Sequence, residues 1–226
     1  MGSMIEFPSN GKTAEGYLAL PAGGGPGVVV IQEWWGLVDH IKEVTDRFAA
    51  EGFVALAPDL YHGEAVTEPD EAAKLMMALQ LERAGRDLGG AIDEVAVRAT
   101  GTGVGVVGFC MGGGLALMAA SQRPDRVRAV VPFYGVVPWE GAQPDYTRLS
   151  GAVLGHYARN DSGASPQAAA ALASTLGEAG NDDVTIHVYE DTDHAFFNDT
   201  RPEVYDAEAS ALAWARTISF LRSHLG

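Results

Sequence analysis

Short runs of apolar residues alternate along this chain with segments of helical periodicity, and this alternation is the strongest constraint on its fold. The expected strands are residues 27–31, 53–57, 104–107, 127–133, 152–157 and 184–189. The expected helices are residues 39–51, 68–79, 81–98, 111–122, 165–179 and 203–225, with a break in 81–98 near Gly85 or Gly89 and Gly90. Such alternation predicts an α/β fold, with helices on both faces of a mostly parallel sheet. Residues 5–7 and 15–20 are candidates for an antiparallel edge.

The length and composition fit one compact unit. The chain has 226 residues, of which 47% are apolar, and it has neither an internal repeat nor a low-complexity linker. We therefore expect a single domain over residues 1–226. Residues 1–3 read as a cloning remnant and are left out of the fold prediction.

The charge balance limits the classes of partner. A formal net charge of −15 disfavours binding to nucleic acid or to anionic membrane surfaces. Residues 100–122 are uncharged and long enough to cross a bilayer, but their many glycines favour a strand, a sharp turn and a packed helix. A lone cysteine excludes an internal disulfide and fits a reducing compartment. With no signal peptide visible, we expect a cytoplasmic protein that is a monomer or a weak homo-oligomer.

The lone cysteine lies in a pattern that predicts a nucleophile. Gly108-Phe109-Cys110-Met111-Gly112 follows the apolar run 104–107 and opens a helical segment. This is a strand–turn–helix elbow with cysteine in place of serine, and its glycines let the strand and the helix approach closely. Unpaired N–H groups at the helix start favour a thiolate there. The alternative is an inert buried cysteine.

The same region also matches a dinucleotide-binding fingerprint, Gly103-Val104-Gly105-Val106-Val107-Gly108. In that motif the glycines follow a strand, whereas Gly105 here falls inside one. We therefore reject dinucleotide binding.

A cysteine nucleophile needs a base and an acid that orients the base. Among the histidines, His194 lies in a loop after the last expected strand, where a side chain can reach the elbow. Asp161 follows the strand 152–157, which gives the order nucleophile, acid, histidine that is typical of this architecture. Asp191 and Asp193 are rivals to Asp161, ranked second because they lie so near His194 in sequence.

Several segments together resemble the dienelactone hydrolase family, from about residue 12 to the C-terminus. They are Ile31-Gln32-Glu33-Trp34-Trp35-Gly36, Ala57-Pro58-Asp59-Leu60-Tyr61, Gly108-Phe109-Cys110-Met111-Gly112-Gly113, Phe133-Tyr134-Gly135 and Asp193-His194-Ala195-Phe196. The resemblance implies an α/β-hydrolase fold and a Cys-His-Asp triad, the same three residues reached above.

The resemblance also implies further site residues. Glu33 would contact the thiol and help to activate it when substrate arrives, and the backbone N–H groups of Trp34 and Met111 would form an oxyanion hole. Trp35, Tyr134, Phe196 and Arg201 are the candidate substrate-binding residues. The arginines and the tyrosine with which well-studied members hold a substrate carboxylate are replaced here by residues that include Pro69, Ala73 and Asn198.

The expected function is hydrolysis of a small ester or lactone through a Cys110 thioester, with no metal or organic cofactor. Two alternatives stay open at this point. The chain could be a sensor or binding protein with a reactive, non-catalytic Cys110, or an enzyme that transfers the acyl group to an acceptor other than water.

Overall fold

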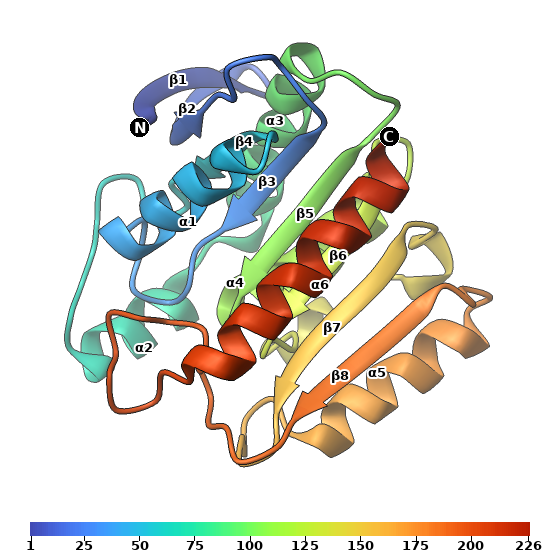
Figure 1. The fold of residues 1–226 in the computed structure, drawn as a ribbon. Helices are drawn as coiled ribbons and strands as arrows, with labels where there is room; N and C mark the ends of the chain where they lie inside the picture. Colours follow the sequence, from blue (N-terminus) through green and yellow to red (C-terminus); the bar gives the residue numbers. More distant parts are fainter.

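One mixed eight-stranded sheet organises the molecule (Figure 1). The computed structural model describes the backbone of residues 1–226 and every side chain except that of Glu140. The strand order is β1-β2-β4-β3-β5-β6-β7-β8. The pairs β1–β2 and β2–β4 are antiparallel, and all other neighbouring strands are parallel. The predicted α/β-hydrolase type of fold is confirmed.

The strands are β1 (Ser3–Ser9), β2 (Lys12–Ala19), β3 (Gly27–Ile31), β4 (Val54–Pro58), β5 (Val104–Phe109), β6 (Val127–Phe133), β7 (Ala152–Ala158) and β8 (Val184–Tyr189). The helices are α1 (Asp39–Ala50), α2 (Pro69–Ala78), α3 (Leu81–Arg98), α4 (Met111–Gln122), α5 (Pro166–Glu178) and α6 (Ala207–Leu225), with short 3-10 turns η1 (Glu140–Ala142) and η2 (Tyr146–Arg148).

Helices cover both faces of the sheet. Apolar side chains of α1 and α6 form one buried cluster with one face of the strands. Side chains of α3, α4 and α5 form a second cluster with the opposite face. Figure 1 shows α6 crossing the sheet on the face that α1 also covers. Strands covered on both sides explain why β3, β4 and β7 are buried along their whole length.

The strand order changes direction between β3 and β5, because the chain goes from β3 to its neighbour β4 and then returns past β3 to β5. The helices that follow β3 and β5 lie on opposite faces of the sheet, so the carboxyl ends of these two strands border a crevice. Ile31 and Gly108 are paired at that end of the two strands. The residues that follow, Glu33 and Cys110, are therefore brought to the same edge of the sheet, where β7 and β8 also end (Figure 1).

Three sequence expectations were wrong. Helix α3 runs unbroken through Gly85 and Gly90. The reason is close packing, since a Cβ on Gly90 would lie 2.3 Å from the carbonyl oxygen of Pro8 in β1. Helix α6 begins only at Ala207, where the side chain of Asp206 caps it. Ser3, which was left out of the fold, belongs to β1 and pairs with Leu18.

The uncharged segment 100–122 folds as predicted into a buried strand and a helix. It forms β5 and α4, joined by the turn at Cys110. Gly105 and Gly108 lie within β5, which agrees with the rejection of a dinucleotide loop. Among the described residues, no helix is both long enough and apolar enough to span a membrane.

Two adjacent glycines in α3 give a matched stability test. Gly90→Ala should lower the free energy of unfolding by about 1–3 kcal/mol, because its Cβ would overlap the β1 backbone. Gly89→Ala should raise it by up to about 1 kcal/mol, because alanine is the better helix former and the nearest atom to its Cβ is 3.8 Å away on Arg123. Urea unfolding of both variants measures this. Equal losses in the two proteins would contradict the packing argument.

Candidate active site

The elbow between β5 and α4 presents the Cys110 side chain on a strained turn. Cys110 has φ 54° and ψ −119° and is half-buried. Its backbone N–H donates to the carbonyl of Phe133 at 3.0 Å. The turn is possible because its neighbours lack side chains: a Cβ on Gly108 would lie 1.9 Å from Gly112 O, and one on Gly112 would lie 2.5 Å from Ile31 O.

Two backbone donors lie in the segments that follow β5 and β3. The N–H of Met111 opens α4 directly after Cys110, and the N–H of Trp34 lies in the loop after β3. Neither donates to another group in the described part of the chain. Free donors on the loop and at the helix start are suited to a negatively charged oxygen.

The loops after β7 and β8 bring His194 and Asp161 together. Hydrogen bonds continue past the last strand pair, from Asn160 N–H to Thr192 O at 3.0 Å. The Nδ1 atom of His194 then lies 2.5 Å from Oδ2 of Asp161. The other carboxylate oxygen of Asp161 accepts from the N–H groups of Gly163 and Ala164, at 2.8 and 3.0 Å. The rivals Asp191 and Asp193 are exposed.

His194 and Asp161 are each held in the charged form by their neighbours. Burial alone would lower the pKa of His194, but hydrogen bonds to Asp161 and Cys110, together with their charges, raise it to about 10. Burial alone would raise the pKa of Asp161, but the hydrogen bond and charge of His194 lower it below its ordinary value. The arrangement therefore favours an imidazolium between a carboxylate and the sulfur.

Glu33 is a buried carboxylate whose partners are neutral. Its side chain is 1% exposed. Oε2 accepts from Nδ2 of Asn198 at 2.8 Å, and Oε1 accepts from the hydroxyl of Tyr134 at 3.4 Å. Asn198 is oriented in turn by Thr200, whose hydroxyl and N–H donate to its Oδ1. In this state Glu33 is held by Asn198 and Tyr134, with no hydrogen bond to Cys110 among the described residues.

Two of the candidate substrate-binding residues lie behind the site. Tyr134 and Phe196 have no exposed surface. The Tyr134 ring packs against the imidazole of His194, with 5.0 Å between centroids, and against Phe196 at 5.6 Å. Burial, with the charge of Glu33 second, holds the pKa of Tyr134 well above its ordinary range, so it is a hydrogen-bond donor to that carboxylate.

The other two line an open cavity. A space of about 320 Å³ is bordered by Trp35, Val38, Val66, Thr67, Asn198, Thr200 and Arg201. The guanidinium carbon of Arg201 lies 5.9 Å from the Trp35 ring centroid, and Arg201 also pairs with Glu203 at 2.9 Å. Because Asn198 both lines this cavity and binds Glu33, the cavity is next to the site.

Comparison with known proteins identifies the family. Residues 14–225 match the family described as "Dienelactone hydrolase family". The chain belongs to the dienelactone hydrolase family. "Protein usf" of Aquifex pyrophilus is 40% identical, and a protein of Aquifex aeolicus named "Putative carboxymethylenebutenolidase" is 36% identical, each over the full length of both chains.

A solved structure agrees with this membership. The crystal structure described as "Putative Dienelactone Hydrolase" of Klebsiella pneumoniae is 27% identical and superposes with a TM-score of 0.88 over 99% of both chains. The predicted family and its hydrolase class are confirmed.

Within this dienelactone hydrolase fold, most of the predicted residues gather at one edge of the sheet. Sequence reasoning recognised Asn198 only as a departure from the family and missed that it binds Glu33. It also missed Tyr61, whose hydroxyl donates to the sulfur of Met111 at 3.3 Å. Nothing in the pattern marks Asn198, whereas Tyr61 stands in a segment that carries the family resemblance.

The charge on His194 gives a pH test. Asp161→Asn should lower the pKa of His194 markedly, because burial then opposes the imidazolium with only Cys110 left to offset it. The stability that His194 contributes in the unmodified protein is complete below its ordinary value of 6.5 and is lost as pH rises through about 10. An NMR titration of the imidazole protons in both proteins measures the shift. An unchanged pKa in Asp161→Asn would contradict the assigned coupling.

Proposed function

We propose that this protein hydrolyses a small ester or lactone through a thioester on Cys110. The observation that carries the proposal is the His194 imidazole, whose Nδ1 lies 2.5 Å from Oδ2 of Asp161 and whose pKa is raised by both Asp161 and Cys110. A nucleophile, a base and an orienting acid in this arrangement are what acyl transfer to a thiol requires. The name of the Aquifex aeolicus relative, "Putative carboxymethylenebutenolidase", supports the substrate class.

The reaction proceeds in two steps. The Cys110 sulfur, whose proton is held by His194, attacks the carbonyl carbon, and the alcohol oxygen leaves with the proton from the imidazolium. His194 then takes a proton from water, which attacks the thioester, and the acid product leaves as the proton returns to the sulfur. Every bond that forms or breaks is between substrate, water and this chain, so the reaction needs no cofactor.

The free N–H groups of Trp34 and Met111 are proposed to hold the oxyanion in both steps. Preorganised donors of this kind each contribute about 3 kcal/mol to related acyl transfers. Their supports are rigid, since one begins a helix and the other follows β3, which pairs with β5 in register.

Glu33 is proposed to assist the thiol when substrate is bound. Its partners, Asn198 and Tyr134, are neutral donors, so leaving them breaks no ion pair. Tyr134 and Phe196 are proposed to position His194 and Glu33 instead of contacting substrate, because both are fully buried. Trp35 and Arg201 keep their proposed role in substrate binding, at the cavity beside Asn198.

The nucleophile is tested by steady-state hydrolysis of p-nitrophenyl acetate and of a dienelactone. Cys110→Ala should lower kcat by about 10³-fold or more, the scale seen when a nucleophile is removed from a triad. Ser174→Ala, on the exposed side of α5, is the control and should keep full activity. Equal rates in Cys110→Ala and the unmodified protein would exclude the proposed mechanism, and rapid alkylation of an inactive protein at Cys110 would favour a sensor.

The role of Glu33 is tested by separating its charge from its packing. Glu33→Gln removes the charge but keeps an amide oxygen that can accept from Asn198, so it should reduce kcat with little loss of stability. Glu33→Gln with Asn198→Asp keeps one donor–acceptor pair but moves the carboxylate to residue 198, so stability, measured by urea unfolding, should stay close to that of Glu33→Gln. Activity should stay low, because the charge is then on residue 198. Full recovery of kcat in the double variant would remove Glu33 from the mechanism.

A further inference from the structure

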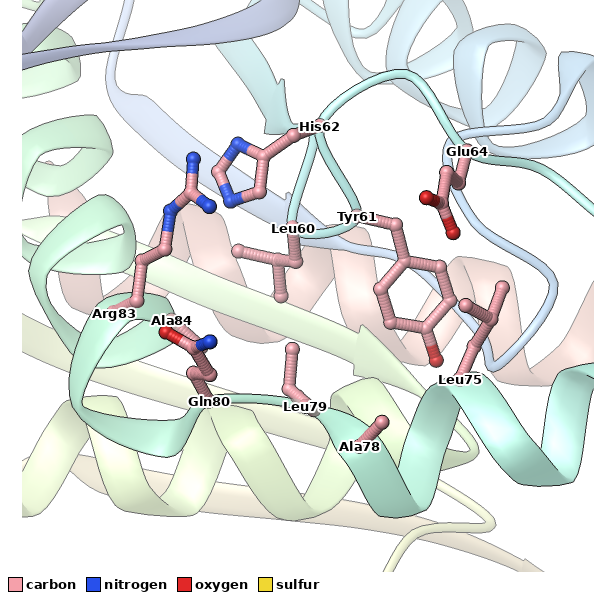
Figure 2. A pocket seen from close by; sticks show the side chains of 10 residues that line it. All are labelled: Leu60, Tyr61, His62, Glu64, Leu75, Ala78, Leu79, Gln80, Arg83 and Ala84. Carbon is pink, nitrogen blue, oxygen red and sulfur yellow. The ribbon is translucent and has the colours of Figure 1, made fainter.

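A second cavity shares no lining residue with the one beside Trp35. It has a volume of about 220 Å³ and lies between the loop after β4, helix α2 and the start of α3. Figure 2 shows its lining: Leu60, Tyr61, His62, Glu64, Leu75, Ala78, Leu79, Gln80, Arg83 and Ala84. No sequence pattern predicted this cavity, and no step of the proposed reaction uses it.

Tyr61 connects this cavity to the start of α4, where Met111 follows Cys110. Its phenol forms part of the cavity wall, and its hydroxyl donates to the sulfur of Met111, the residue after Cys110. Burial raises the pKa of Tyr61, and the nearby charge of Cys110 raises it further, so this hydroxyl stays protonated and can donate. The Tyr61 backbone is fixed by Asp59, whose carboxylate accepts from the N–H groups of Tyr61 and Gly63 at 3.0 and 2.6 Å.

The interior of the cavity suits an uncharged chain. Its lining includes the aliphatic side chains of Leu60, Leu75 and Leu79, and Figure 2 shows Leu60 and Leu79 facing each other in the middle. Figure 2 shows the charged groups at its two ends, with His62 and Arg83 side by side at one and Glu64 at the other.

The basic side chains at the first end are already engaged. Asp87, which is buried, lies 3.4 Å from Nε2 of His62 and 4.0 Å from Nε of Arg83, and it accepts from the Ser9 hydroxyl at 2.5 Å. Basic groups that already face a buried carboxylate have little attraction left for an anionic ligand.

We infer that this cavity binds the apolar chain of the ester substrate, beside Tyr61 and in reach of Cys110. The inference rests on the proposed function, since the chain is delivered to the same thiol. Substrate would lie with its carbonyl at Cys110, a polar or aromatic part toward Trp35 and Arg201, and an aliphatic part of several carbons toward Leu60 and Leu79. Each methylene buried there contributes about fourfold in kcat/KM, which corresponds to about 0.8 kcal/mol.

Chain-length dependence of hydrolysis tests the assignment. In the unmodified protein, kcat/KM should be higher for p-nitrophenyl hexanoate than for the acetate. Ala78→Trp, which fills the cavity from α2, should lower the hexanoate-to-acetate ratio roughly tenfold, the effect of excluding about two methylenes. Met77→Trp is the matched control on the same helix, because Met77 is 64% exposed and does not line the cavity. Its ratio should stay within about twofold of the original.

Alkylation of Cys110 gives a readout that needs no turnover. The thiolate displaces iodide from iodoacetamide or from N-hexyl iodoacetamide, with His194 keeping the thiol proton. The hexyl reagent should react faster at Cys110, and Ala78→Trp or the milder Ala78→Leu should remove that preference. Absence of ester hydrolysis with this preference intact would reject the proposed function and keep the cavity assignment. If both Ala78 variants keep the preference for the hexyl reagent and Cys110 is still reactive, the cavity assignment is overturned.

Discussion

Parallel pairing of β3 with β5 is the constraint on which the rest of this structure depends. Val29 pairs with Val106 and Ile31 with Gly108, so the two strands end together and their following loops face each other. Helix α4 can begin at this edge only because Gly112 brings its backbone against the end of β3. A one-residue slip would turn the side chains of β3 to the opposite faces of the sheet and separate Glu33 and Trp34 from Cys110.

The electrostatics of the site combine one strongly coupled pair with one weakly held charge. His194 and Asp161 each hold the other in its ionised form at 2.5 Å. Glu33 is buried against neutral donors only, at a position where burial of an unpaired carboxylate is costly. The first arrangement gives a fixed imidazole orientation, and the second leaves a carboxylate that can change partners without disrupting a salt bridge.

The order of the elements and the residues Cys110, His194 and Asp161 could be predicted from local sequence patterns. The features that were missed all depend on contacts between residues far apart in sequence. Cys110, His194 and Asp161 follow strand ends, and strand ends are readable from runs such as Val104–Val107. The continuity of α3 was not readable, because Gly90 is explained by its contact with Pro8, which lies far away in sequence. The contact of Asn198 with Glu33 and that of Tyr61 with Met111 are likewise long-range. The burial of Tyr134 and Phe196 was also not readable, because the sequence indicates the order of the elements but not how deeply each side chain is buried.

The conformation of Cys110 sets folding and chemistry against each other. Cys110 has φ 54°, a conformation that glycine adopts without strain. For a residue with a side chain, such strain costs about 1–3 kcal/mol. Replacing Cys110 by glycine should therefore stabilise the folded protein, but it would remove the nucleophile, so selection for activity keeps the strained residue. A relative with glycine at position 110 should unfold at a higher temperature than this chain and should be unable to form an acyl-enzyme.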